Sequence, residues 1–254
     1  MTIAILSRSP ASQLPPPPKL DLTDTVSVFL DFDGTLVEIA DHPQNVVVAA
    51  ALPQILTRLS ERLEGRLAIV SGRALAALDA FLGPIPVAMA GSHGGEFRPA
   101  GASEARALAA PLPASVLEAL RTFAQDNGSL VFEAKPFSAA VHYRDRPGVG
   151  DALVGFAGQL ADGSGLLMKH GKMVVELTMP GSDKGNAVTE FMKMAPFEGT
   201  RPLFLGDDVT DEDAFAAVRG YDGGGVLVGP PRRTQALWRL DGVAAVHEWL
   251  EQPA

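Results

Sequence analysis

The sequence feature that most constrains the fold lies at residues 28–34 (VFLDFDG), where a short apolar run ends in two carboxylates. The β-favouring residues of this run predict a buried strand. If the chain stays extended through Asp31 and Asp33, the two side chains share one face. Gly34 then permits a sharp turn where a larger residue would clash. The carboxyl end of a strand is the usual place for a site in an open α/β sheet.

Two neighbouring anions at a strand end point to a ligand. Mg²⁺ prefers hard oxygen ligands and usually keeps waters and a substrate phosphate, and a carboxylate beside it can form an aspartyl-phosphate. The alternative is a capped loop or a Ca²⁺ turn. An EF-hand loop that starts at Asp31 needs Gly and Glu where the chain has Leu36 and His42. The residue chemistry therefore favours phosphoryl transfer over the capped loop.

Two later apolar runs also end in polar residues. Residues 67–70 precede Ser71, which is either a phosphate contact at a helix start or a simple helix N-cap. Residues 87–90 precede the glycine-rich segment 91–95 (GSHGG), whose backbone is suited to close approach. A single histidine in such a loop, His93, is typical of local hydrogen bonding.

The second half of the chain adds a lysine and a cluster of acids. Lys184 opens a predicted helix, where acids are normally preferred, so it is either functional or a plain surface lysine. The strand predicted at residues 202–205 is followed by 206–213 (GDDVTDED), with five acids. A helix cap at Thr210 explains Asp211 and Asp213, and leaves Asp207 and Asp208 without a structural reason.

The order of elements predicts an α/β fold with a doubly wound parallel sheet and a smaller inserted α/β domain. The expected division is a flexible, proline-rich tail at 1–24, a core at 25–98 and 181–254, and an insert at 99–180. Residues 15–18 are four prolines and predict an extended linker. Residues 235–240 and 243–250 are predicted to be the last two helices.

Composition narrows the classes of partner. The 254 residues are 46% hydrophobic and carry a net charge of −9, which argues against nucleic acid and anionic membranes. The absence of cysteine excludes disulfides, zinc-thiolate sites and cysteine nucleophiles. No apolar run has the length of a membrane span or a signal peptide. We expect a cytoplasmic monomer that acts on a small molecule, with no nucleic-acid or membrane partner.

In a doubly wound sheet the carboxyl ends of parallel strands lie along one edge. Residues that follow different strands are therefore expected to converge there: Asp31, Asp33, Ser71, Lys184 and Asp207. Together they supply a nucleophile, an acid/base, a metal site, a hydroxyl and a cation. Phosphoryl transfer depends on this combination of positioning and charge neutralisation.

The insert carries its own polar set, with strand spacing at residues 133 and 135 and again at 142 and 144. Its members are Glu133, Lys135, His142, Arg144, Lys169, His170, Lys172 and Glu176. Such a face is usually a solvated surface. It also has the donors and acceptors that a polyhydroxylated ligand requires.

These motifs resemble those of the haloacid dehalogenase superfamily. The segment 31–35 (DFDGT) matches its first motif, Ser71 the second, Lys184 the third and 206–208 (GDD) the fourth. Within that superfamily the chain resembles the trehalose-6-phosphate phosphatases. The resemblance rests on segments 91–94 (GSHG), 133–136 (EAKP), 142–144 (HYR), 171–176 (GKMVVE) and 207–212 (DDVTDE).

The resemblance implies a haloacid-dehalogenase-like core with an α/β cap, and hydrolysis of a sugar phosphate. Asp31 is the implied nucleophile and Asp33 the acid/base, while Ser71 and Lys184 bind the phosphoryl group. The implied Mg²⁺ site consists of Asp31, Asp33 through its backbone carbonyl, Asp207 and Asp208, with Asp208 and Asp211 orienting the ligands. The implied substrate-binding residues are Gly91, Ser92, His93, Glu133, Lys135, His142, Arg144, Lys172 and Glu176.

Three alternatives stay open. The chain could hydrolyse another sugar phosphate, such as sucrose phosphate, or act as a phosphomutase, since only the cap residues would differ. It could also be a silent sugar-phosphate sensor on the same fold. Retention of Asp31, Asp33, Lys184 and Asp207 argues against the sensor, which would tolerate loss of the nucleophile.

Overall fold

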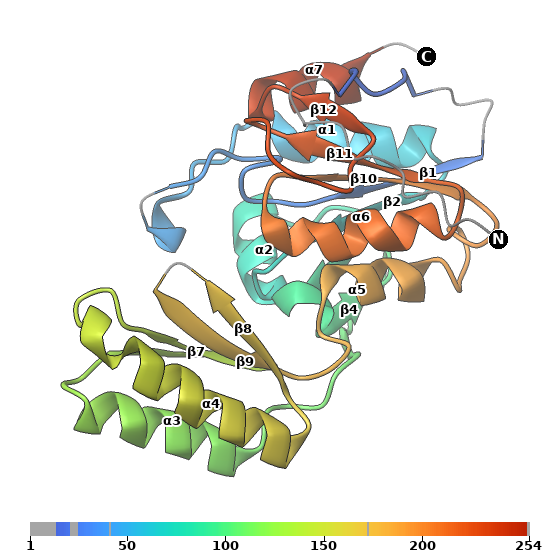
Figure 1. Ribbon diagram of the computed structural model, residues 1–254. Helices are drawn as coiled ribbons and strands as arrows, with labels where there is room; N and C mark the ends of the chain where they lie inside the picture. The colour runs from blue at the N-terminus through green and yellow to red at the C-terminus, as the bar shows by residue number, and fades with distance from the viewer. Residues whose placement is uncertain (1–13, 21–24, 41, 172, 253–254) are drawn as a thin grey trace, which may run out of the picture.

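The computed structural model describes residues 14–20, 25–40, 42–171 and 173–252, which form two sheets flanked by helices (Figure 1). The larger sheet has eight strands. Their spatial order is β12 (Trp238–Leu240), β11 (Gly224–Val228), β10 (Arg201–Gly206), β1 (Val26–Leu30), β2 (Leu67–Val70), β3 (Ala88–Gly91), β4 (Glu96–Arg98) and β5 (Arg106–Ala107). The first six are parallel, and β4 and β5 form an antiparallel edge.

Helices cover both faces of this sheet. One face packs against α1 (Leu52–Arg62), α2 (Leu75–Leu82) and α7 (Val243–Glu251). The other packs against α5 (Lys184–Phe191) and α6 (Glu212–Arg219). Because both faces are covered, β1, β2 and β11 are buried at every residue, as expected for parallel strands with continuous apolar sequences.

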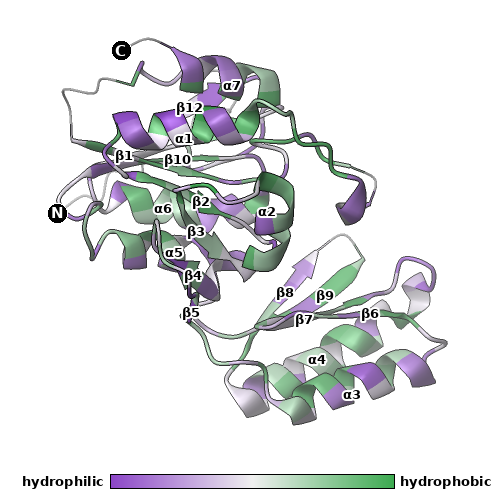
Figure 2. Cartoon of the chain, turned by 180° about the vertical axis from the view of Figure 1, so that it is seen from behind, coloured by the Kyte–Doolittle hydropathy of each residue, from purple (hydrophilic) through white to green (hydrophobic). Residues whose placement is uncertain are grey.

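Within the predicted insert, the elements between residues 114 and 178 form a second sheet covered by helices. Its antiparallel sheet has the order β6 (Val131–Ala134), β7 (Ser138–His142), β9 (Val174–Thr178) and β8 (Leu167–Gly171). Helices α3 (Ala114–Asp126) and α4 (Gly150–Ser164) pack on one face of it. The other face is turned toward the larger sheet (Figures 1 and 2), and its polar strand residues appear as purple segments in Figure 2.

The predicted fold class is therefore confirmed: a doubly wound, mostly parallel sheet carries a smaller inserted α/β unit. The larger sheet continues to β5, beyond the boundary expected at residue 98. The division of the chain by residue number stays a prediction. No helix among the described residues is long and apolar enough to cross a bilayer.

The helix predicted at residues 235–240 is wrong. Trp238–Leu240 is strand β12, paired in parallel with residues 226–228 of β11. The Leu237 amide also donates to the Gly225 carbonyl at 2.8 Å. A short apolar run is compatible with a helix or a strand, and pairing with the edge of β11 favours the strand.

The proline run is held against the core, at least over residues 14–20. Leu20 is buried in the core cluster on the α1 side, and Leu14 packs against the opposite cluster. The Trp249 indole donates to the Pro18 carbonyl at 2.9 Å, and the Arg239 amide donates to the Pro15 carbonyl at 3.0 Å. The prolines therefore lie beside edge strand β12, where a flexible tail was expected. Residues 1–13 and 21–24 of that tail lie outside the described part.

We expect the Leu20→Ala variant to lose about 2–3 kcal/mol of unfolding free energy, because the truncation leaves a cavity in the core. Urea denaturation measures this loss. Lys19→Ala, at an exposed neighbouring position, is the control and should stay close to the unmodified chain. Equal stability of both variants would show that this segment does not contribute to the core.

Candidate active site

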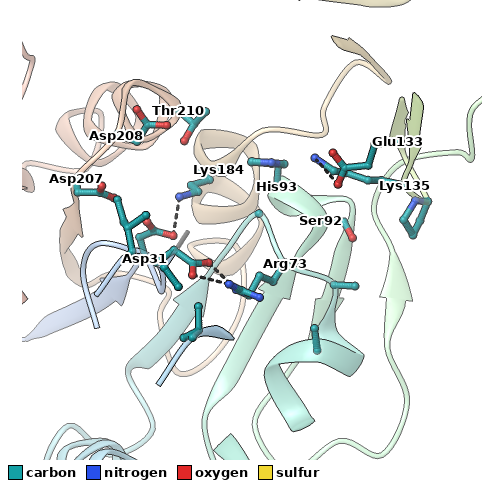
Figure 3. A pocket seen from close by; sticks show the side chains of 18 residues that line it. Asp31, Arg73, Ser92, His93, Glu133, Lys135, Lys184, Asp207, Asp208 and Thr210 are labelled. Carbon is teal, nitrogen blue, oxygen red and sulfur yellow. Dashed lines mark hydrogen bonds and ion pairs between the residues drawn. The ribbon is translucent and has the colours of Figure 1, made fainter. Parts of the chain in front are cut away.

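A cavity of about 650 Å³ lies between the carboxyl edge of the larger sheet and the insert. The larger sheet contributes residues that follow β1, β2, β3 and β10, and the insert contributes the segment 133–136 (Figure 3). Its polar lining residues are Asp31, Asp33, Arg73, Ser92, His93, Glu133, Lys135, Lys184, Asp207, Asp208 and Thr210. The parallel sheet has therefore brought together side chains that are far apart in sequence.

A buried lysine, Lys184, lines the side of this cavity that faces the larger sheet. Lys184 Nζ is 2.7 Å from Asp31 Oδ1 and 2.6 Å from Asp211 Oδ1, and all three side chains are buried. Burial opposes the charged form of Lys184, but Asp31 and Asp211 outweigh it and raise the pKa of the lysine. Lys184 is therefore a fixed cation, and the prediction of a plain surface lysine is excluded.

Local structure explains the placement of Lys184. The preceding residue, Asp183, is the N-cap of α5, and its Oδ1 accepts the Asn186 amide at 2.7 Å. Lys184 is consequently the first residue of the helix. A cation at this position is unfavourable for the helix alone, and its two carboxylate partners compensate.

Three carboxylates gather around the lysine. One ligand oxygen each from Asp31, Asp207 and Asp211 lies within 4.8 Å of the others. Burial and then Asp211 raise the pKa of Asp207 to about 6. Burial also raises the pKa of Asp31, opposed by Lys184. The single lysine does not neutralise the set, so these oxygens fit the demand of a divalent cation for hard ligands.

Two glycines make this crowding possible. A Cβ atom on Gly34, where φ is 77°, would lie 2.2 Å from Asp207 Oδ2. A Cβ atom on Gly206 would lie 2.3 Å from the Asp211 carboxyl carbon. Gly34 thus serves the predicted turn and also leaves room for the carboxylate of Asp207, which follows β10.

The acidic loop is capped differently from the prediction. Asp208, not Thr210, is the N-cap of the short helix η5 (Val209–Asp211). The Asp208 amide donates to Asp211 Oδ2 at 2.9 Å, while the other oxygen of Asp211 faces Lys184. Asp211 therefore combines the predicted capping role with a place in the charge cluster.

Arg73 is a site residue that the sequence reasoning missed. Its Nε and Nη2 bind the two oxygens of Asp33 at 2.6 and 2.7 Å. The guanidinium lies 5.0 Å from the Phe81 ring centre, which restricts its position further. The missed signal is the arginine two residues after Ser71 at a strand end. Figure 3 shows Arg73 at the cavity wall.

Ser71 is buried behind the cavity wall. Its Oγ accepts the Arg73 amide at 3.1 Å, and it is not among the lining residues. The alternative interpretation as a helix N-cap does not apply to α2, whose N-cap is Ala74. The hydroxyl shapes the turn that directs Arg73.

The glycine-rich loop places Ser92 and His93 in the wall. His93 has a left-handed backbone with φ of 56°, and a Cβ on Gly72 would come within 2.6 Å of its ring. Burial, followed by the charge of Lys184, lowers the pKa of His93 to about 4. The imidazole is therefore neutral at pH 7, as suits a local hydrogen-bonding residue.

The insert contributes a charged wall. Lys135 Nζ lies 3.7 Å from Glu133 Oε1 and 3.5 Å from Glu176 Oε1. Ser138 Oγ donates to Glu176 at 2.7 Å. Burial opposes ionisation of Glu176, but Lys135 and this hydrogen bond lower its pKa overall. Glu133 and Lys135 face the cavity in Figure 3.

Several residues predicted for the site are not in the cavity wall. Glu176 supports Lys135 from behind, and His142 lies 3.4 Å from Glu133 Oε2 on an exposed surface. Arg144 is exposed, and Gly91 is buried at the end of β3. Lys172 lies outside the described residues. The wall also includes apolar residues that no motif indicated, namely Ile39, Ala40, Val46, Ala74 and Ala77.

Comparison with known proteins agrees with this geometry. The family model for trehalose-phosphatase matches residues 29–242. A trehalose-6-phosphate phosphatase of Escherichia coli is 39% identical over 233 residues, which cover 91% of this chain and 87% of that protein.

Two solved structures share the fold. The C-terminal domain of the trehalose-6-phosphate phosphatase of Candida albicans has a TM-score of 0.72 and 25% identity, covering 89% of this chain and 91% of that one. The C-terminal domain of a Candida albicans trehalose synthase regulatory protein has the same TM-score at 14% identity, covering 94% and 100%, and shows the fold alone. The family match and the close relative show that this chain is a phosphatase that belongs to the trehalose-phosphatase family.

Proposed function

We propose that this phosphatase hydrolyses trehalose 6-phosphate to trehalose and phosphate, with Mg²⁺ as cofactor and an aspartyl-phosphate intermediate. The observation that carries the proposal is the buried cluster of Lys184, Asp31 and Asp211 at one wall of a cavity. The opposite wall presents Glu133 and Lys135 from the insert. One wall suits a phosphoryl group, and the other suits a polyhydroxylated sugar.

The cation would be held by Asp31 and Asp207, with Asp211 adjacent. Asp33 was expected to contribute only its backbone carbonyl, and this agrees with its carboxylate being bound to Arg73. Asp208 lines the cavity and stays a predicted ligand or orienting acid. When bound, Mg²⁺ supplies neutralisation of the charge on the phosphoryl oxygens.

In the proposed reaction, an Asp31 carboxylate oxygen attacks phosphorus and the bond from phosphorus to the sugar oxygen breaks. Asp33, which takes up a proton from solvent when its ion pair with Arg73 opens, gives that proton to the leaving oxygen. Asp33 then takes a proton from water as the water attacks the aspartyl-phosphate, which releases phosphate and restores Asp31. Lys184 faces the nucleophile throughout and neutralises charge that develops on the phosphoryl oxygens.

Arg73 positions the acid/base. Its two-point contact with Asp33 fixes the carboxylate at the cavity wall. Proton donation needs one Asp33 oxygen to turn toward the leaving group, so we expect this ion pair to open partly when substrate binds. Ser71 is proposed to act on the phosphoryl group through the loop that it shapes, since its own side chain is buried.

The insert acts as a cap that selects the sugar and excludes water. The alternatives with another sugar phosphate depend on this wall, because the core cluster would be the same. A silent sensor is disfavoured, since the complete buried cluster costs stability that a sensor has no reason to keep.

The proposed function is tested by phosphate release with Mg²⁺ on trehalose 6-phosphate, sucrose 6-phosphate, glucose 6-phosphate and a phosphoprotein. We expect a strong preference for trehalose 6-phosphate, lost on addition of EDTA and restored by excess Mg²⁺. Equal release across the panel would contradict the sugar assignment. Release that persists in EDTA would contradict the metal assignment, and absence of release would favour the sensor.

We expect Lys135→Met to raise KM for trehalose 6-phosphate about tenfold or more, because a charged hydrogen bond to the sugar is worth about 1.5–3 kcal/mol. Hydrolysis of p-nitrophenyl phosphate, which has no sugar, should change little. Lys193→Met removes the same charge from an exposed position in the turn after α5 and should leave both substrates unaffected. An equal loss of activity on both substrates would show that Lys135 acts on the phosphoryl group and not on the sugar.

A further inference from the structure

The loop that follows β11 carries an arginine that no motif indicated. Arg232 is partly buried, and it does not line the cavity. Its guanidinium instead reaches the acidic loop from behind. Nε donates to the Asp207 carbonyl at 3.2 Å, and Nη2 donates to the Asp208 carbonyl at 2.6 Å.

Arg232 is itself held in place. Its Nη1 forms an ion pair with Glu212 and donates to the Arg233 carbonyl at 3.1 Å. The second oxygen of Glu212 accepts the Gln235 amide at 2.7 Å. The guanidinium of Arg232 is therefore hydrogen-bonded on both sides. A mobile surface ion pair, by contrast, contributes little to stability.

The segment that Arg232 holds lies between the end of a strand and a short helix. Strand β10 ends at Gly206, so the Asp207 and Asp208 carbonyls lie outside its regular strand span. From the cavity side the segment is held by the bond from the Asp208 amide to Asp211 and by the ion pair of Asp211 with Lys184. The Asp208 carbonyl also accepts the Asp211 amide at 3.1 Å. Arg232 is the side chain that binds both successive carbonyls, and it thereby restricts the direction of the Asp207 carboxylate.

We propose that Arg232 is a positioning residue that sets the divalent-cation affinity of the acidic cluster by fixing the backbone of Asp207 and Asp208. The inference rests on the proposed function, because it assumes that the cluster binds a cation. Partners behind metal ligands commonly change metal affinity by about 10–100-fold.

The sign of the effect separates this role from simple electrostatics. The guanidinium is a positive charge close to the acidic loop, so its removal alone would strengthen cation binding. Loss of positioning would weaken it. Lysine keeps the charge and lacks the planar fork, so Arg232→Lys should bind the cation more weakly than the unmodified chain. Arg232→Met, which also lacks the charge, should bind weakly too.

The test is Mn²⁺ binding to the full chain without substrate, followed by electron paramagnetic resonance of the free ion. We expect the dissociation constant to rise about tenfold in Arg232→Met and to rise less in Arg232→Lys. Arg233→Met removes a neighbouring exposed side chain and should bind as the unmodified chain does. Melting curves in EDTA identify any variant that is unfolded.

A second readout uses turnover. The Mg²⁺ concentration for half-maximal hydrolysis should rise about tenfold in Arg232→Met, with an unchanged KM for trehalose 6-phosphate at saturating Mg²⁺. Unchanged or tighter Mn²⁺ binding by both folded Arg232 variants would overturn the inference. If the unmodified chain binds no Mn²⁺, or if binding survives Asp207→Asn, the metal site of the proposed function fails, and the inference fails with it.

Discussion

The buried contact of Lys184 with Asp31 and Asp211 is the interaction on which the rest of the site depends. Three carboxylates within a few ångströms would repel one another strongly away from water. The lysine offsets two of them and leaves the cluster short of positive charge. In the proposed function, a divalent cation bound together with the substrate supplies the missing positive charge, so the excess of negative charge favours cation binding. Removing the lysine would leave uncompensated buried charge.

The fold supplies this contact through long-range topology. Residues that follow β1 and β10 meet Lys184 because the two strands are parallel neighbours in the centre of the sheet. The glycine at position 34 lets their loops approach closely. The insert then adds a second wall with different chemistry, built on its own antiparallel sheet. In the proposed function, charge for the phosphoryl group and hydrogen bonding for a sugar are thus supplied by separate units.

Much of this arrangement could be predicted from the sequence, because the strand-end residues and Lys184 violate local preferences that only a site explains. Arg73 was missed although it follows a strand end two residues after Ser71, because its partner Asp33 is 40 residues away in sequence. Asp211 satisfied a capping pattern, and this concealed its contact with Lys184. The helix predicted at residues 235–240 was wrong because a neighbour outside that segment, strand β11, determines the structure there. The burial of Leu20 likewise depends on core residues remote in sequence.

The most direct test of the account is mass spectrometry of the chain acid-quenched during turnover of trehalose 6-phosphate. In the proposed mechanism the attacking oxygen belongs to Asp31, so phosphate should be found on the peptide that carries this residue. The Asp31→Asn variant, which keeps the size of the side chain, should carry none and should turn over no substrate. Phosphate on a different residue, or normal turnover by Asp31→Asn, would contradict the assignment of the nucleophile.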